Sequence, residues 1–270
     1  MSHDAPRPDP TKMKVVYALP GMENVPVRRD LPYREVDGET LTFDLYAPAN
    51  AAPGEKRPAV VFVSGYPDRG LQIVMGARFK EMGGYVGWAQ LAAASGMVGI
   101  LATNREPVAD LAALLRHLRE HGPALGIDPA RIGIWAGSGN APNALSRLMK
   151  DAEVPIACAV LAYGLLMDLD GATGVAQASA AFHFANACAA RSIDDLRTDV
   201  PLFLVRAGRD QPGLNEVIDR FVAAALARNL PLTVANHPAA PHAFDLVDDT
   251  DETREMIRRM LGFLRYYLRA

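Results

Sequence analysis

Cysteine is scarce in this sequence of 270 residues, which contains only Cys158 and Cys188. Two cysteines in a chain of this length do not make a disulfide framework, and Cys158 falls in an apolar strand pattern where a buried free thiol is usual. Long apolar runs are missing too, since none reaches the roughly 18 residues that span a bilayer. We therefore expect neither a disulfide-stapled domain nor a membrane-spanning protein.

The sequence also has no large excess of charge of one sign. The 28 basic and 31 acidic residues give a formal net charge of -3, which favours neither nucleic acid nor an anionic membrane as partner. The stretch 1–10 has no apolar segment typical of a secretory signal, so a cytoplasmic location is the default expectation. There is no P-loop, no His-Glu-x-x-His and no paired Cys-x-x-Cys, and we predict no metal or organic cofactor.

The sequence is rich in apolar residues: 50% of its residues are hydrophobic. That is enough for a large core, and we expect one domain over 1–270. Short apolar runs that suit buried strands alternate with segments of helical spacing, which indicates a parallel sheet with right-handed crossovers. The predicted buried strands are Ala59–Val63, Met97–Ala102, Arg131–Trp135, Ile156–Tyr163, Pro201–Ala207 and Leu232–Asn236.

The first part of the chain has a different pattern. Residues 1–13 are rich in proline and polar groups, which predicts a flexible arm, and Lys14–Leu19 could add a short strand. Two strand-like runs, Tyr33–Val36 and Leu41–Tyr46, flank Asp37-Gly38. Because this dipeptide favours a tight turn, the two runs predict an antiparallel hairpin.

The stretch Ile132–Pro142 places a serine, Ser138, between two glycines, at the point where a strand pattern gives way to a helical one. A serine at such a turn projects its hydroxyl clear of the sheet, and the helix behind it offers free N–H groups to a developing oxyanion. The same residue could serve only as a turn or helix-capping residue. The glycine flanks favour a nucleophile.

This stretch, with its lead-in Gly126–Ile134, resembles the α/β-hydrolase family, in particular its serine esterases of the carboxylesterase and dienelactone hydrolase type. The family pattern is Gly-x-Ser-x-Gly, and here Ala136 and Asn140 stand at the outer positions. The resemblance implies a mostly parallel sheet of about eight strands with helices on both faces. It also implies a small cap after the sixth strand, which we place at 163–199.

The family's chain order of serine, acid and histidine implies two partners for Ser138. Asp210 follows a predicted strand where the family's acid lies, and His242, two positions before a phenylalanine, looks like the family's base. The less well-placed acids are Asp168, Asp170 and Asp199, and the nearest rival base is His237. All three chosen residues come after parallel strands, where open α/β sheets carry their sites.

The rest of the site is also drawn from the resemblance. The N–H of Gly139 and that of Gly65 or Tyr66 would form the oxyanion hole, although Ser64 replaces the histidine that is usual in that loop. Three apolar residues of the cap segment suggest an acyl or alcohol pocket: Met167, Phe182 and Phe184. His183 in the same segment is expected to pack or to touch substrate, and His117 and His121 to be solvated.

These residues predict a serine hydrolase that cleaves a carboxylic ester of a small molecule through an acyl-enzyme intermediate. Two alternatives stay open. The same triad would serve an amide or peptide hydrolase, and the departures at Ser64, Ala136 and Asn140 are compatible with a non-catalytic binding protein on a hydrolase scaffold. A homodimer is conceivable through an edge strand or the last helix.

Overall fold

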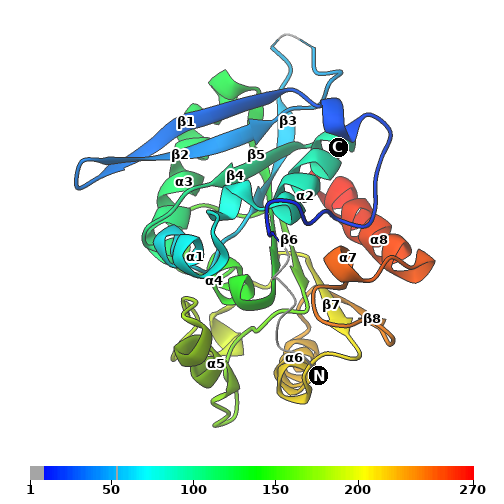
Figure 1. Cartoon of the computed structure of the whole chain (residues 1–270). Helices are drawn as coiled ribbons and strands as arrows, with labels where there is room; N and C mark the ends of the chain where they lie inside the picture. The colour runs from blue at the N-terminus through cyan, green and yellow to red at the C-terminus, as the bar shows by residue number, and fades with distance from the viewer. Residues whose placement is uncertain (1–8, 53) are drawn as a thin grey trace.

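The structure is a computed structural model and describes residues 9–52 and 54–270. Over these residues, eight strands form one sheet in the order β1-β2-β4-β3-β5-β6-β7-β8 (Figure 1). The strands are β1 (Val27–Val36), β2 (Glu39–Tyr46), β3 (Arg57–Phe62), β4 (Val98–Ala102), β5 (Ile127–Gly137), β6 (Cys158–Ala162), β7 (Leu202–Ala207) and β8 (Leu232–His237). Strand β2 runs antiparallel to both of its neighbours, and the strands from β4 to β8 run parallel to one another. The predicted mostly parallel sheet is therefore confirmed.

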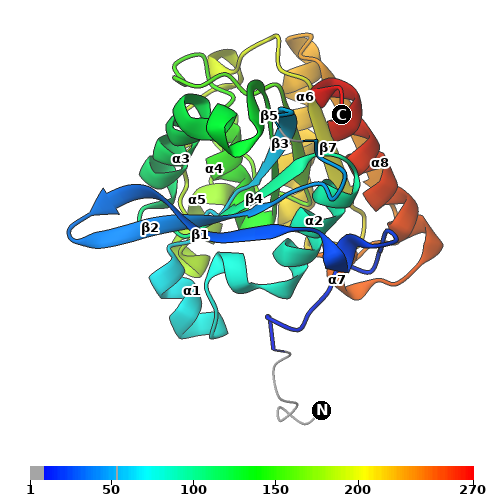
Figure 2. The same ribbon diagram turned by 90° about the horizontal axis from the view of Figure 1, so that it is seen from above.

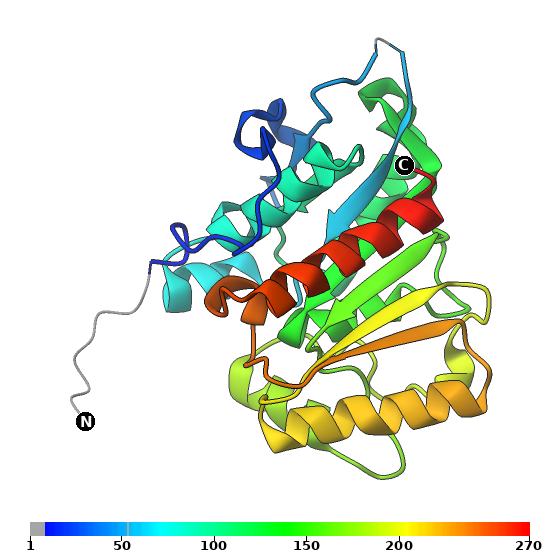
Figure 3. The ribbon, with the colours of Figure 1, turned by 90° about the vertical axis from the view of Figure 1, so that its right-hand side faces the viewer.

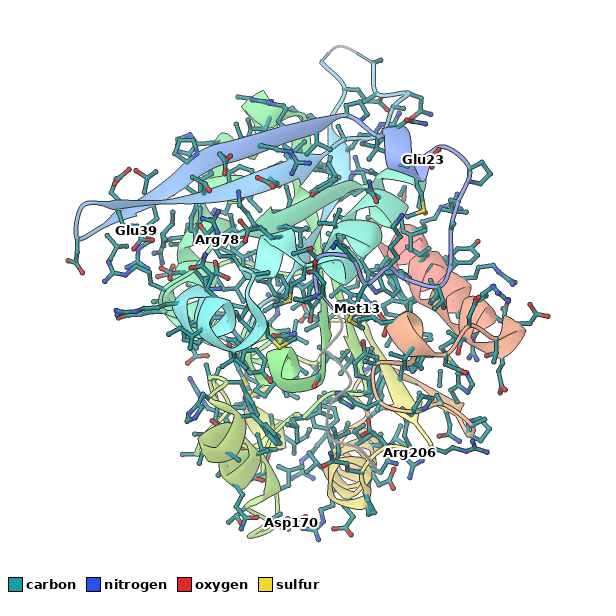
Figure 4. All side chains as sticks on the ribbon, viewed as in Figure 1. Met13, Glu23, Glu39, Arg78, Asp170 and Arg206 are labelled. Atoms are coloured by element: carbon teal, nitrogen blue, oxygen red, sulfur yellow. The ribbon has the colours of Figure 1, made fainter. Side chains whose placement is uncertain are left out.

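The hairpin of β1 and β2 is also confirmed. Its two-residue turn places Asp37 at φ 50° and Gly38 at φ 79°. Two successive left-handed residues match the twist of the flanking strands, which explains why this dipeptide makes the turn. The hairpin extends beyond the rest of the sheet in Figure 1, and Figure 4 shows Glu39 near its outer end.

Helices cover both faces of the sheet, as predicted (Figures 2 and 3). The apolar residues of α2 and α8 join one buried cluster with Trp135 and Phe203, while those of α3, α4 and α6 join another with Ile134 and Leu204. Successive side chains of a strand point to opposite faces, so continuous apolar runs are needed to fill both clusters. The helices of four or more residues are α1 (Asp68–Met75), α2 (Gly83–Ala94), α3 (Pro107–His121), α4 (Ala141–Ser146), α5 (Gly174–Phe182), α6 (Pro212–Ala227), α7 (Phe244–Val247) and α8 (Asp251–Leu268), with one 3-10 helix, η3 (Gly122–Leu125).

The N-terminal region differs in part from its prediction. Most of the predicted arm, residues 1–8, lies outside the described residues. The strand predicted at Lys14–Leu19 is wrong, because this stretch has no strand in the structure. Instead Val15 is buried, and the N–H of Val16 donates to the carbonyl oxygen of Asp245 over 2.9 Å. Packing against the body of the protein replaces pairing with the sheet edge.

The segment 163–199 follows β6, at the place predicted for a cap. It contains α5 and the 3-10 helix η5 (Ile193–Asp195), and Figure 4 shows Asp170 at the outer end of this region. Helix α5 ends at Phe182, and His183 directly after it adopts the left-handed conformation with φ 62°. Two residues on, the N–H of Ala185 donates to the carbonyl oxygen of Gly65 over 2.7 Å. This hydrogen bond connects the segment to the loop that follows β3.

Candidate active site

Ser138 follows β5 directly and has a strained backbone, with φ 57°. Few residues other than glycine adopt this conformation, and such strain is held in place only where the surroundings enforce it. The space beside the serine is narrow: a Cβ atom at Gly139 would lie 2.4 Å from Tyr66 Oη and 2.8 Å from Phe184 Cδ1. Glycine is therefore required next to the serine, and the sharp turn carries the Ser138 hydroxyl off the end of the strand.

Three side chains from different loops form a hydrogen-bonded row. His242 Nε2 lies 2.8 Å from Ser138 Oγ, and His242 Nδ1 lies 2.6 Å from Asp210 Oδ2. The Asp210 side chain is 1% exposed and the His242 side chain 39% exposed. A buried carboxylate that accepts from Nδ1–H leaves Nε2 free to accept the serine proton. The structure thus brings together the three residues that the chain order singled out.

The rival residues lie elsewhere. His237 is buried, and its Nε2 lies 3.0 Å from Thr253 Oγ1 on α8, where it ties β8 to that helix. Asp168 accepts the N–H groups of Val175 and Ala176 at the start of α5, and Asp199 pairs with Arg197. These carboxylates are engaged in local structure and none contacts His242.

The loop after β3 presents two backbone N–H groups near the serine, and they differ in what they already bind. Gly65 N donates to the side-chain oxygen of Asn140 over 2.8 Å, in a buried position. Tyr66 N donates to Ser64 Oγ over a longer 3.2 Å, and Tyr66 also lines the cavity described below. A hydrogen bond of 3.2 Å is at the weak end of the usual range. Of the two N–H groups, that of Tyr66 can therefore turn to a ligand at the smaller cost in free energy.

Two buried asparagines hold this loop from α4 and the turn before it. Asn140 accepts from Gly65 and donates its amide to Tyr85 Oη over 2.7 Å. Asn143 donates to the carbonyl oxygen of Ser64 over 2.8 Å and to that of Pro107 over 2.9 Å. The loop after β3 is thus hydrogen-bonded from both sides. Asn140, a departure from the family pattern in the sequence, has a definite structural role.

Replacing Asn140 with alanine should lower kcat for an ester substrate by about 10- to 100-fold, with a smaller change in KM. The substitution leaves Gly65 N without its partner and frees the loop, and misplaced oxyanion donors cost rates of this order. It should also lower the free energy of unfolding by about 1–3 kcal/mol, because a buried group is left unsatisfied. Steady-state kinetics and urea unfolding measure the two effects.

Tyr85→Phe is the matched control for Asn140. It removes the hydroxyl that accepts the Asn140 amide but keeps the bond between Asn140 and Gly65. We expect kcat to change by less than about threefold, since the loop remains fixed. If Asn140→Ala lost stability but kept its kcat, Asn140 would serve the fold and not the position of the donors.

A cavity of about 500 Å³ lies against Ser138 and His242. Its wall is mainly aromatic and aliphatic, with contributions from α1, α2 and the end of α5. Phe182 and His183 line it, whereas Met167 is buried in the hydrophobic core and Phe184 packs edge-on against Tyr66 at a ring distance of 5.9 Å. The aromatic part of the wall consists of Tyr66, Phe79, Tyr85, Trp88, Trp135, Tyr163 and Phe182.

The polar groups in the cavity floor are bonded to one another. Asp245 accepts from Trp88 Nε1 over 2.7 Å and from Tyr163 Oη over 2.6 Å. Burial raises the pKa of the Asp245 carboxyl, and burial together with this carboxyl raises the pKa of the Tyr163 hydroxyl. The Tyr163 ring also packs edge-on against His242, at a ring distance of 5.1 Å. The network supports the histidine and leaves the cavity with an apolar surface.

Metal-ligand and membrane-spanning features were sought over the described part of the chain. It contains no group of three or more His, Cys, Asp or Glu residues that could hold a metal ion. None of its helices combines the length and the apolar character needed to cross a bilayer.

The strand order, the two helical layers and the serine on its sharp turn give this chain the α/β-hydrolase fold. Known structures agree. The chain is similar to a thermophilic esterase, Est2, from the planctomycete Thermogutta terrifontis, at 20% identity and a TM-score of 0.68 over 92% of this chain and 94% of that chain. The same esterase phosphoramylated by tabun matches at 21% identity and a TM-score of 0.66, over 92% of this chain and 95% of that chain. At these identities the likeness shows a shared fold.

Comparisons at the level of sequence add nothing to this result. No protein-family description matches the chain, and no curated protein matches it.

Proposed function

We propose that this protein is a serine hydrolase that cleaves carboxylic esters of small molecules through an acyl-enzyme intermediate. The observation that carries the proposal is the row Ser138–His242–Asp210, with distances of 2.8 and 2.6 Å, at the wall of an apolar cavity. A serine hydroxyl is a weak nucleophile until a base takes its proton. Such a base, with its orienting acid, lies within hydrogen-bond distance.

In the first half of the proposed reaction, Ser138 Oγ attacks the ester carbonyl carbon while His242 Nε2 takes the hydroxyl proton. The negative charge that develops on the carbonyl oxygen is met by the N–H groups of Gly139 and Tyr66. When the tetrahedral intermediate collapses, the bond to the alkoxy oxygen breaks and His242 gives its proton to the leaving alcohol. Asp210 stabilises the imidazolium between these steps.

In the second half, water replaces the alcohol. His242 Nε2 takes a proton from the water, whose oxygen attacks the acyl carbonyl, and the bond to Ser138 Oγ then breaks as Nε2 returns the proton to it. The carboxylic acid leaves and the free serine is restored. The His242 side chain is 39% exposed, so solvent reaches this histidine. Residues 163–199 act as the cap in this proposal, because Phe182 and His183 line the cavity.

The structural neighbours support this reading. Other structures of the Thermogutta terrifontis esterase include a propionate-bound and a butyrate-bound form, and forms phosphonylated by sarin and phosphorylated by paraoxon. Organophosphates react with activated serines. We extend this reactivity to Ser138.

A fluorescent fluorophosphonate tests the proposal directly. Wild-type protein should be labelled at one site, and peptide mass spectrometry should find the label on Ser138. Ser138→Ala should stay unlabelled under the same conditions. Absence of label on the folded wild-type protein would contradict the hydrolase assignment and would favour a binding protein on a hydrolase scaffold.

The cavity wall also favours a substrate class. Apart from two histidines, none of the side chains that line it is basic. Butyrate esters should therefore exceed otherwise identical hemisuccinate esters in kcat/KM by about 100-fold or more, because an unpaired carboxylate loses its hydration in an apolar cavity. Hydrolysis rates of the two p-nitrophenyl esters measure this. Equal rates would place the acyl group outside this cavity.

A cytoplasmic location and a homodimer stay predictions from the sequence. Fractionation of cells and light scattering after size-exclusion chromatography would test them.

A further inference from the structure

A second cavity, of about 350 Å³, shares no lining residue with the cavity at Ser138. It lies where the C-terminal end of α4 meets α3 and the loops around 151 and 191. Three arginines from three separate elements line it: Arg116 on α3, Arg147 directly after α4, and Arg191. Arginine side chains pair readily with carboxylates and phosphates, so three of them on one cavity point to an anionic ligand.

Arg147 is the arginine of this cavity without an acidic partner. Its Nε donates to Ser146 Oγ over 3.0 Å, and over the described chain no carboxylate oxygen lies within 4 Å of its guanidinium. Burial lowers the pKa of this guanidinium below its ordinary value. Because Nε is already used, the two terminal nitrogens are left as a pair of donors, the geometry that a carboxylate accepts in bidentate fashion.

The other two arginines pair with acids at the surface. Arg116 Nη1 lies 2.7 Å from Glu153 Oε2, with side chains 48% and 67% exposed, and Arg191 pairs with Asp151. Ion pairs this exposed contribute little to stability, so either arginine can turn toward an anion at small cost. The three arginines exceed the two acids of the lining by one positive charge.

Apolar residues contribute the smaller part of the lining surface, beside the arginines, Ser146, Asp151 and Glu153. Side chains of Val108, Ala112, Leu115, Met149 and Val154 line the same cavity. A small organic acid would place its carboxylate on Arg147 and its short hydrocarbon part beside these apolar side chains, which an inorganic anion would not contact.

We propose that this cavity binds a small organic carboxylate, with Arg147 as the bidentate anchor. The site is independent of the hydrolase chemistry, since its residues and those around Ser138 do not overlap. Its occupancy can therefore be measured at equilibrium with no turnover.

Isothermal titration of the full chain with benzoate tests the proposal, with benzyl alcohol and inorganic phosphate as comparison ligands. Arg147→Gln should weaken benzoate binding by at least about tenfold, the usual cost of losing one charged partner. Arg258→Gln is the matched control, because Arg258 is an exposed arginine paired with Glu255 on α8, on the other face of the sheet. It should bind benzoate as the wild type does.

A second variant tests the same cavity in case Arg147→Gln does not fold. Ala112→Leu keeps every charge and fills the apolar part of the cavity, so it should weaken benzoate binding by a similar factor. Near-ultraviolet circular dichroism checks that both variants are folded. Unchanged affinity in Arg147→Gln and Ala112→Leu would place benzoate elsewhere, for example beside Ser138, and would overturn the proposal. So would binding of benzyl alcohol or phosphate as tight as that of benzoate.

Discussion

Replacing Ser138 with alanine is expected to lower kcat/KM for p-nitrophenyl butyrate by more than about 10⁴-fold, the scale seen when a triad nucleophile is removed. The substitution deletes the hydroxyl oxygen that the proposed reaction acylates, while the cavity and the backbone N–H groups beside it remain. Residual turnover should fall to the level that bound, oriented water supports. Initial rates under saturating and limiting substrate measure the change.

Ser95→Ala is the control for this variant. Ser95 follows α2, far from the row of three side chains, and its loss should leave kcat/KM within about twofold. The free energy of unfolding of Ser138→Ala should lie within about 1 kcal/mol of that of the wild type, because alanine keeps the same strained backbone and no large contact is lost. Ester turnover by the alanine variant equal to that of the wild type would remove Ser138 from the chemistry.

The second large effect is expected at His242. Changing it to alanine removes the proton acceptor 2.8 Å from Ser138 Oγ and should lower kcat by about 10⁴-fold or more. Turnover should rise again with pH in this variant, because hydroxide can replace the lost base. A kcat–pH profile of the variant and the wild type measures both expectations.

His237→Ala offers the informative contrast. This histidine is buried and bonded to Thr253, so its loss should lower the free energy of unfolding by about 1–3 kcal/mol while kcat stays within about threefold. Thermal unfolding and kinetics of the two variants should therefore show opposite patterns. If His237→Ala abolished turnover and His242→Ala preserved it, the base would be His237.

The position of the site could be predicted because it depends on a simple property of parallel sheets. Ser138, Asp210 and His242 each follow a strand in the same direction, and the carboxyl ends of parallel strands share one edge. Apolar runs placed the strands, and the resemblance to the α/β-hydrolases supplied the chain order of serine, acid and histidine after them. The lengths of the elements could not be predicted as closely: the strand predicted over Arg131–Trp135 is β5, which runs from Ile127 to Gly137.

Other features depend on contacts between distant segments. Helix α1 was not predicted, because its eight residues are fewer than the roughly 11 or more over which helical spacing is recognised, and its apolar Ile73 and Val74 are exposed at 78% and 62%. Met167 and Phe182 looked equivalent in the sequence, but one lies in the core and the other in the cavity wall. The polar residues Asn143 and Asp245 were missed for the same reason, because their partners are far away in the chain.

The sequence by itself determined the alternation of strands and helices and the serine on its turn, because these follow from local periodicity and from residues adjacent in the chain. Only the tertiary structure decided between Gly65 and Tyr66 as the freer N–H. That choice depends on Asn140, 75 positions along the chain, whose side chain reaches Gly65 only in the folded protein. Hydrogen bonds between such distant residues leave no periodic trace in a sequence, and they set the fine geometry of the site.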